Sequence, residues 1–494
     1  MDKYALIDIC SNRVRMTLVR IKEKSYANPF EVFSQPTTLG SDLQNDNLIK
    51  QNTIQEIISI VKAYEKTALM NGVTKIVVAI YGFVESAKNF TSFYDHFFNS
   101  TGHVMHLIRD NDEANAIFAS VISSVDQPKG MICCVTDTNA FVINYTKKAI
   151  VSYKKISLHN LIKEGLSPDD VYTRVKAEIA SIDIPADFDF ELPVVACGPA
   201  FRTLGKIARK VLKYPIDIEH MFVLSSEQFI AVHDCIRSLT TEKVVKIKGV
   251  SEESGKHLTV DLAIIKALIE GLNIKSFSIS ANGIREGLID NLIVRPVTEK
   301  PVFDVLGNSL DNIRAFYDFD MEHSDMVYKF ALILFKQLKV VHKLHRTYVK
   351  PLRVAATLFN CGKLVNFKND SRYAFDIIVN SNVFGLSQRE LVLAGFICMC
   401  QNQDNFNLSD WVKYQPMFIE ADLDAVKKLG TILRLAASFA KFKTKNISDL
   451  ECDILGDSVI MKTIATAPIK YEILEGMKVC NDFKKVFKKT LEII

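Results

Sequence analysis

The sequence lacks a long apolar run and a strong excess of either charge. No apolar stretch in its 494 residues comes near the roughly 18 residues that a membrane-spanning helix needs, and the acidic N-terminus has no apolar core of the signal type. The formal net charge is only +4, which is too small to indicate a nucleic-acid partner. We therefore expect a cytoplasmic protein that has neither a membrane nor a nucleic acid among its partners.

Cysteine pairs at the spacing of a zinc site are also missing. The 10 cysteines are scattered and lie mostly in apolar runs, which is typical of reduced thiols in a cytosol. Cys398 and Cys400 form one close pair, but no second pair follows, so a place in the core is favoured over metal binding. The composition, with 48% hydrophobic and 24% charged residues, is that of an ordinary globular protein of several domains.

The N-terminal stretch 4–21 predicts two strands joined by a polar turn. An apolar run leads to Asp8, a turn of small polar residues follows at 10–12, and apolar and polar side chains then alternate. The backbone N–H groups of such a turn can wrap a phosphate, as they do in actin-like ATPase folds. A plain hairpin with a surface aspartate fits the same pattern.

The same design recurs at residues 131–145, and this internal repeat predicts two related actin-like lobes that face each other across a cleft. Strand and helix patterns alternate up to about residue 298, which predicts α/β sheets with crossover connections. Long helical patterns follow, and a short segment with some strand character ends the chain. We place the boundaries at 1–125 and 126–298 for the two lobes, 299–442 for the helical domain and 443–494 for a small appendix.

Three further segments carry a resemblance to a known family. Residues 278–293, SISANGIREGLIDNLI, contain a turn at 280–287, Asp112 and Glu113 open a helix, and a long helical pattern begins at Glu322. Together with the N-terminal motif, these segments resemble the exopolyphosphatase and guanosine pentaphosphate phosphohydrolase (Ppx/GppA) family along nearly the whole chain. The resemblance implies an α/β actin-like (ribonuclease H-like) double lobe, followed by an all-α HD-like domain and a small C-terminal α+β appendix.

The resemblance also implies a homodimeric hydrolase that removes terminal phosphates from inorganic polyphosphate, or the equivalent γ-phosphoryl group from the guanosine alarmone pppGpp. In such a site, turn N–H groups and an arginine hold the anion, acids hold Mg²⁺, and a glutamate activates the attacking water. Glu113 matches that base, although the helix dipole alone also favours a carboxylate in a first helical turn. The residues that match the phosphate contacts are Asp8, Ser11, Asn12, Arg15 and Gly198.

The phosphate-binding turns depart from the family pattern by losing glycines and acids. In the first turn Cys10 stands at the position of a glycine, and Arg13 adds a cation. The second turn, residues 134–141, lacks the run of glycines and both acids, and Asp137 adds a negative charge. We therefore assign no metal ligand. The other replacements are Val84 for an arginine, Cys134 and Phe141 for the two acids, Pro199 and Ala200 for glycine and threonine, Phe359 and Asn360 for a His-Asp pair, and Tyr373 for a histidine.

Two functions therefore stay open. The first is a phosphohydrolase of weak or altered activity, with Mg²⁺ as its cofactor if it is active. The second is a non-catalytic relative that binds a polyanion, an alarmone or a protein partner. Arg285 and Glu286 fit either a ligand contact or a brace between strands. A group of C-terminal lysines fits either a solvated helix face or a polyanion site, and it comprises Lys484, Lys485, Lys488 and Lys489.

Overall fold

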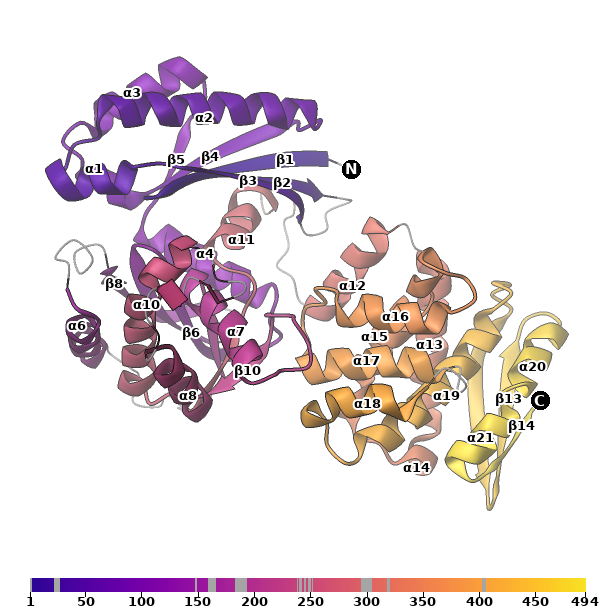
Figure 1. Cartoon of the computed structure of the whole chain (residues 1–494). Coiled ribbons are helices and arrows are strands. Elements are labelled where there is room, and N and C mark those ends of the chain that lie inside the picture. The colour runs from indigo at the N-terminus through magenta and orange to yellow at the C-terminus, as the bar shows by residue number, and fades with distance from the viewer. Residues whose placement is uncertain are drawn as a thin grey trace. The chain divides into compact units, whose positions relative to one another are not determined.

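The computed structural model of the chain describes residues 2–21, 27–146, 149–158, 166–182, 193–237, 239, 242–243, 246–247, 250, 252–294, 304–317, 320–401 and 406–494. These residues fall into two compact units, Met1–Asn308 and Ser309–Ile494 (Figure 1). No helix in these ranges is long and apolar enough to cross a membrane. All 10 cysteines are free thiols.

The first sheet of the N-terminal unit begins with the predicted strand–turn–strand. β1 (Asp2–Ile9) and β2 (Arg13–Ile21) pair antiparallel, which places Asp8 opposite Arg15. The side chains of β2 alternate as the sequence predicts, because every second residue of a strand points to the same face. The sheet adds β3 (Asn28–Pro36), β4 (Lys75–Tyr81) and β5 (Met105–Ile108), in the order β3-β2-β1-β4-β5.

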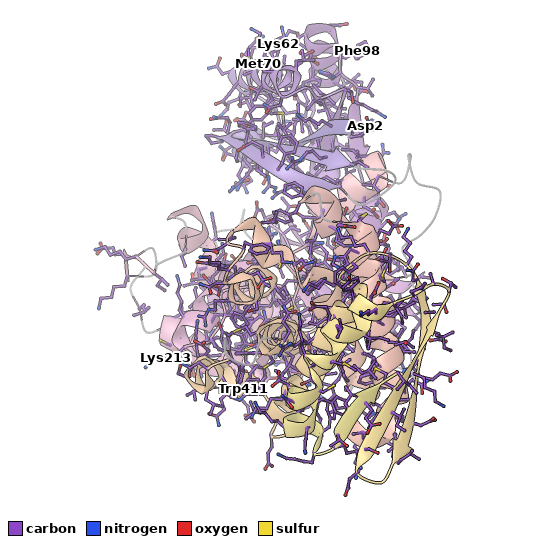
Figure 2. All side chains as sticks on the ribbon, turned by 90° about the vertical axis from the view of Figure 1, so that its right-hand side faces the viewer. Asp2, Lys62, Met70, Phe98, Lys213 and Trp411 are labelled. Atoms are coloured by element: carbon purple, nitrogen blue, oxygen red, sulfur yellow. The ribbon has the colours of Figure 1, made fainter. Side chains whose placement is uncertain are left out.

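One face of this sheet is covered by helices that come from between its strands. α1 (Leu39–Asp46), α2 (Gln51–Met70) and α3 (Phe90–Thr101) lie on the same side of the strands in Figure 1. Apolar residues of α2 and α3 at helical spacing pack on those of β1, β2 and β4 in one core. Exposed side chains lie on the outer side of this helical layer, as Lys62, Met70 and Phe98 show in Figure 2.

The second sheet repeats the topology of the first. Its order is β10-β11-β9-β6-β7-β8, with a meander of three antiparallel strands, β6-β7-β8, followed by parallel pairing of β6 with β9 and of β9 with β11. The first sheet has the corresponding meander β1-β2-β3 and parallel strands β4 and β5, so the predicted repeat is confirmed. The strands are β6 (Lys129–Val135), β7 (Asn139–Thr146), β8 (Ala149–Ser157), β9 (Val194–Cys197), β10 (Phe222–Ser225) and β11 (Ser276–Ile279).

The helices of the second lobe pack on one face of its sheet. Their apolar residues form a single core with every second residue of β6. The helices are α6 (Pro168–Ala180), α7 (Pro199–Val211), α8 (Ser226–Arg237) and α10 (Glu252–Gly271).

Two helices, α4 (Asp110–Ile122) and α11 (Ile284–Ile289), pack between the two sheets. Ala116 of α4 belongs to the core that the first sheet forms with α11, whereas Ile117 and Phe118 belong to the core of the second sheet. The helices cross closely at Gly287, where an added Cβ would lie 1.7 Å from the carbonyl oxygen of Ala116. This contact explains on steric grounds why the turn at 280–287 ends in a glycine.

The C-terminal unit is helical and ends in a small sheet. The helical patterns expected from the sequence are present, and the helix that carries the first two of the C-terminal lysines ends where Lys488 adopts a left-handed conformation (φ 56°). The sheet has the order β12-β13-β14, with β12 (Ile447–Leu455), β13 (Ser458–Ala465) and β14 (Thr490–Ile493). The helices are α12 (Val305–Phe316), α13 (Met321–Gln337), α14 (Lys339–His342), α15 (Val349–Leu358), α16 (Asp370–Val379), α17 (Gln388–Cys400), α18 (Leu408–Tyr414), α19 (Asp422–Ala440), α20 (Lys470–Met477) and α21 (Cys480–Phe487).

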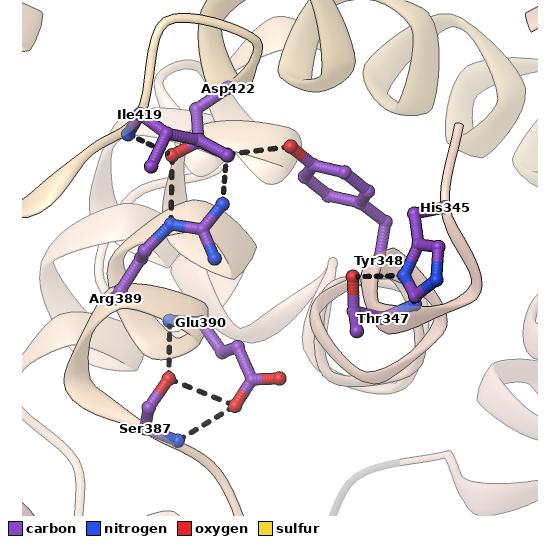
Figure 3. Close-up of polar contacts among 8 residues, drawn as sticks. All are labelled: His345, Thr347, Tyr348, Ser387, Arg389, Glu390, Ile419 and Asp422. Atoms are coloured by element: carbon purple, nitrogen blue, oxygen red, sulfur yellow. Dashed lines mark hydrogen bonds and ion pairs between the residues drawn. The ribbon is translucent and has the colours of Figure 1, made fainter. Parts of the chain in front are cut away.

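A buried carboxylate joins three segments of this helical unit (Figure 3). Asp422 is fully buried at the start of α19 and accepts hydrogen bonds from Nε (2.9 Å) and Nη2 (2.5 Å) of Arg389. The hydroxyl of Tyr348 (2.8 Å) and the backbone N–H of Ile419 (2.8 Å) donate to the same carboxylate. Burial beside Asp422 raises the pKa of Tyr348 to about 12, so its hydroxyl stays a donor.

We expect Asp422→Ala to lower the free energy of unfolding of the C-terminal unit by about 2–4 kcal/mol, because Arg389 and Tyr348 would lose their common acceptor. Asp424→Ala is the matched control on the same helix. Asp424 is largely exposed and pairs with Lys428 one turn away, so its loss should cost less than about 0.5 kcal/mol. Equal effects of the two substitutions in urea unfolding would contradict the structural role assigned to Asp422.

Candidate functional site

The predicted first phosphate turn is bound to its own neighbours. Asp8 is fully buried, and its Oδ2 accepts hydrogen bonds from Nε (3.3 Å) and Nη2 (3.2 Å) of Arg15. The Cys10 thiol donates to the same oxygen (3.2 Å), and burial next to Asp8 raises the pKa of this thiol. Arg15, which the resemblance assigns to phosphate, is thus paired with the carboxylate that the resemblance assigns to the same site.

The backbone of this turn is also engaged. The N–H of Cys10 donates to the carbonyl oxygen of Arg13 (2.8 Å), which closes the hairpin. The carbonyl oxygens of Ser11 and Asn12 accept hydrogen bonds from the backbone of residues 40 (2.6 Å) and 37 (2.9 Å). The turn is therefore fixed by the segment that leads into α1.

Glu113 lies in the first turn of α4, where only 3% of it is exposed. Its Oε2 accepts a hydrogen bond from Nδ2 of Asn139 at the start of β7 (3.1 Å). Burial is the main cause that raises the pKa of Glu113 to about 7, although Lys155 and Asn139 both lower it. Such a carboxyl exchanges its proton near neutral pH, as a general base has to do.

Tyr81 is a further buried residue whose hydroxyl is affected by both Asp8 and Glu113. It ends β4, only 8% of it is exposed, and no partner of its buried hydroxyl occurs among the described residues. Burial raises the pKa of this hydroxyl, Cys10 and Asp8 raise it further, and Glu113 makes a smaller contribution in the same direction. The charges of both carboxylates therefore act on the same hydroxyl.

The sequence assigns no role to Tyr81, which lies three residues before Val84, the replacement for a family arginine. The sequence nevertheless contains a feature that points to Tyr81. Tyr81 is the single hydroxyl-bearing residue at the end of an otherwise apolar run, KIVVAIY, and the ends of parallel strands in α/β sheets are where ligands bind.

The second predicted phosphate turn is closed by hydrogen bonds of its own. The N–H of Thr136 donates to the carbonyl oxygen of Asn139 (2.8 Å), and the N–H of Asn139 donates to Oγ1 of Thr136 (3.0 Å). Asp137 at its tip is exposed, and its charge raises the pKa of both Cys10 and Asp261. Burial raises the pKa of Asp261 in α10 to about 7. The turn thus presents negative charge rather than a nest of N–H groups.

Gly198, the predicted contact of the third turn, has a positive φ of 96°, and an added Cβ would lie 2.2 Å from the carbonyl oxygen of Val135. Close packing against β6 is therefore sufficient to require a glycine here. Arg202 in the helix that follows donates to the carbonyl oxygen of Ala281 (3.0 Å), and Glu286 accepts from the N–H of Gly283 (2.8 Å). Both of these hydrogen bonds brace the turns at the sheet edge.

The donor set does not fit Mg²⁺. Cys134 and Phe141, which replace the implied acids, are fully buried, and the Cys134 thiol is hydrogen-bonded to that of Cys197 on the neighbouring strand, which raises its pKa. Asp8 is held by a guanidinium instead of facing a second acid. Among the described residues, no group of three or more His, Cys, Asp or Glu side chains could hold a metal ion.

In the C-terminal unit, the positions that match the family His-Asp pair are occupied by Phe359 and Asn360. The ring of His323 contacts Phe359 edge-on, with 5.6 Å between centroids. Two of the predicted polyanion-binding lysines have partners nearby, since Lys485 pairs with Asp482 (3.6 Å) and Lys489 donates to the carbonyl oxygen of Gly456.

Most of the chain matches a known protein family. Residues 32–295 match the family described as Ppx/GppA phosphatase family, and residues 307–468 match Ppx/GppA phosphatase, domain III. A guanosine-5'-triphosphate,3'-diphosphate pyrophosphatase of Aeromonas salmonicida is 29% identical over 165 residues, which cover 33% of this chain and 32% of that protein. The match therefore spans about a third of that relative's length.

Two solved structures share the fold. The Ppx/GppA family member of Aquifex aeolicus has a TM-score of 0.52 at 20% identity, covering 60% of this chain and 98% of that one. An exopolyphosphatase from Cytophaga hutchinsonii has a TM-score of 0.52 at 15% identity, covering 59% and 97%. The actin-like double lobe expected from the sequence is thereby confirmed.

The raised pKa of Glu113 predicts a pH-dependent stability. Its proton is bound more tightly in the folded chain, so the stabilisation is complete below the ordinary pKa of 4.5 and is lost as pH rises through about 7. Glu113→Gln keeps an acceptor for Asn139 without the charge. We expect this variant to be more stable than the wild type by up to roughly 3 kcal/mol at pH 8.5 and equally stable near pH 4.5, measured by urea unfolding.

Glu56→Gln, at an exposed position on α2, is the matched control and should change stability at neither pH. If the difference between wild type and Glu113→Gln were the same at both pH values, the carboxyl would not be buried as the structure has it.

Proposed function

Because the chain belongs to the Ppx/GppA phosphatase family, we propose that it hydrolyses the terminal phosphoanhydride bond of polyphosphate or of the alarmone pppGpp, at a rate far below that of an intact family member. The observation that carries this proposal is Glu113. The carboxyl is buried, is oriented by Asn139 and has a pKa of about 7, so a large fraction of it is ionised at neutral pH and can accept a proton from water.

In the proposed reaction Glu113 acts as the general base. Water attacks the terminal phosphorus as Glu113 accepts its proton, and the bond to the bridging oxygen breaks, which leaves a phosphate and a shortened chain. The Tyr81 hydroxyl is within electrostatic reach of Glu113 and can orient the water, since its high pKa keeps it protonated. Asn139 holds the carboxylate in place.

The low rate follows because the predicted phosphate-binding turns offer few contacts to the anion. Arg15 is paired with Asp8, the first turn uses the Cys10 N–H for its own closure, and the second turn presents Asp137. Three missing charge-assisted contacts of about 1.5–3 kcal/mol each reduce transition-state stabilisation by a thousandfold or more. Since the donor set does not fit Mg²⁺, nothing in this account depends on the metal.

The second candidate function is a non-catalytic relative that binds a polyanion, an alarmone or a protein partner. It is favoured by the inward pairing of Asp8, Cys10 and Arg15, because these three groups bind one another in the absence of a substrate. The two candidates differ in one measurable respect, because only the first releases phosphate through Glu113.

We expect phosphate release from polyphosphate and pppGpp at least about a thousandfold slower than the 1–1000 s⁻¹ of ordinary enzymes. The rate should rise with pH through about 7, because only ionised Glu113 accepts the proton. Glu113→Gln should abolish it, whereas Glu56→Gln should not change it. The measurement is release of inorganic phosphate over hours. Release that persists in Glu113→Gln would come from a contaminant or another site, and its complete absence in the wild type would favour the non-catalytic candidate.

The pairing of Arg15 with Asp8 predicts an unusual effect on polyphosphate binding. Asp8→Asn removes a negative charge and frees Arg15, so it should tighten binding by about tenfold, and Arg15→Ala should weaken it by a similar factor. Calorimetric titration at two salt concentrations is the measurement, and affinity should fall steeply with salt because binding releases counterions. Asp2→Asn, at the exposed start of β1, is the control. Unchanged affinity in both Asp8 and Arg15 variants would place polyphosphate elsewhere on the chain.

A further inference from the structure

A short loop in the C-terminal unit presents large apolar side chains to solvent. It joins η4 (Cys361–Leu364) to α16, and all its residues from Lys363 to Asn369 are exposed. The exposed fractions are 57% for Leu364, 58% for Val365 and 77% for Phe367. Single exposed apolar residues are common in proteins. Three of them within four positions form an apolar patch, which is a feature of protein, membrane or ligand binding sites.

The base of this loop is firmly held. An added Cβ on Gly362 would lie 1.7 Å from the carbonyl oxygen of Asp370, so the two ends of the loop are in backbone contact. The N–H groups of Val365 and Asn366 both donate to the carbonyl oxygen of Gly362 (3.0 Å each), and Oδ1 of Asn366 accepts from the N–H of Lys368 (2.9 Å). The apolar side chains are thus displayed by a preformed turn, and little conformational entropy is lost when they are buried.

The charges of the loop are all positive. Lys363 and Lys368 flank the apolar residues, and no acidic residue occurs between Asn360 and Asn369. The ammonium group of Lys363 lies 5.8 Å from the centroid of the Phe367 ring, so cation and aromatic ring occupy the same tip. Apolar side chains flanked by two lysines are complementary to a surface that is apolar below and anionic above.

We propose that this loop inserts into the surface of a membrane that contains anionic lipids. Leu364, Val365 and Phe367 enter the boundary between headgroups and acyl chains, and Lys363 and Lys368 stay at the level of the lipid phosphates. A protein partner fits less well, since a stable protein interface buries about 800 Å² on each side and needs some 20 residues, many more than the loop provides. One loop of this size attaches the chain reversibly and does not span the bilayer.

The experiment is co-sedimentation of the full chain with vesicles of phosphatidylcholine alone or with about a third of phosphatidylglycerol. We expect binding to the anionic vesicles only, weakening as salt rises. Phe367→Ser should weaken partitioning by about tenfold, and Lys363→Glu combined with Lys368→Glu should abolish the preference for anionic lipid. Val412→Ser is the matched control, because Val412 is 61% exposed on α18 of the same unit and should have no effect.

A second readout reports insertion directly. The chain has a single tryptophan, Trp411, which is only 7% exposed (labelled in Figure 2) and should not respond to vesicles. The emission of Phe367→Trp should therefore shift to shorter wavelength when anionic vesicles are added, and the emission of Val412→Trp should not. The proposal is wrong if no shift occurs at low salt, or if Val412→Ser reduces binding as much as Phe367→Ser. It is also wrong if Phe367→Ser abolishes self-association in light scattering while vesicles bind neither protein.

Discussion

The close crossing of α4 and α11 is the contact on which the N-terminal unit depends. The missing side chain of Gly287 lets the backbone of Ala116 approach, and the two helices then fill the space between the sheets. That approach places the first turn of α4 next to the start of β7, where Asn139 meets Glu113. The position of the candidate base is thus a consequence of helix packing some residues away from it.

The same packing explains why the polar groups of the site are buried. The face of the first sheet that carries Asp8, Arg15 and Tyr81 is covered by α4 and α11, so its polar groups are removed from water. A buried charge needs a partner, and Arg15 is the partner within reach of Asp8. Where glycine-rich turns would bring N–H groups to an external anion, this chain satisfies its charges internally. Asp8 and Arg15 can serve a substrate only by exchanging partners, whereas the Tyr81 hydroxyl has no partner among the described residues.

Much of the architecture could be predicted from the sequence, because it rests on local patterns. The alternation in β2, the repeat at 131–145 and the turn before α11 are each visible within about 15 residues, and all three are confirmed.

The site itself was harder to predict. The pairing of Arg15 with Asp8 depends on the register across the turn, and charged residues in an alternating strand have the pattern of a solvated face. Only helices more than 90 residues away in the sequence bury that face. For the same reason the neighbours of Glu113 and Tyr81 in the sequence indicate neither the raised pKa of Glu113 nor the place of Tyr81 at the site. The sequence singles out Gly198, but the close approach of Val135 that requires a glycine there is visible only in the fold.

The distribution of the free thiols allows local opening of the fold to be measured at several places in the chain. Cys133, Cys134 and Cys197 are buried in the second sheet, Cys361, Cys398 and Cys400 are buried in the helical unit, and Cys235 is exposed. Burial raises the pKa of the Cys133, Cys398 and Cys400 thiols, so these groups react with an alkylating reagent only when their surroundings open. Rates of alkylation, compared with that of Cys235, therefore measure how often each part of the chain opens while the rest stays folded.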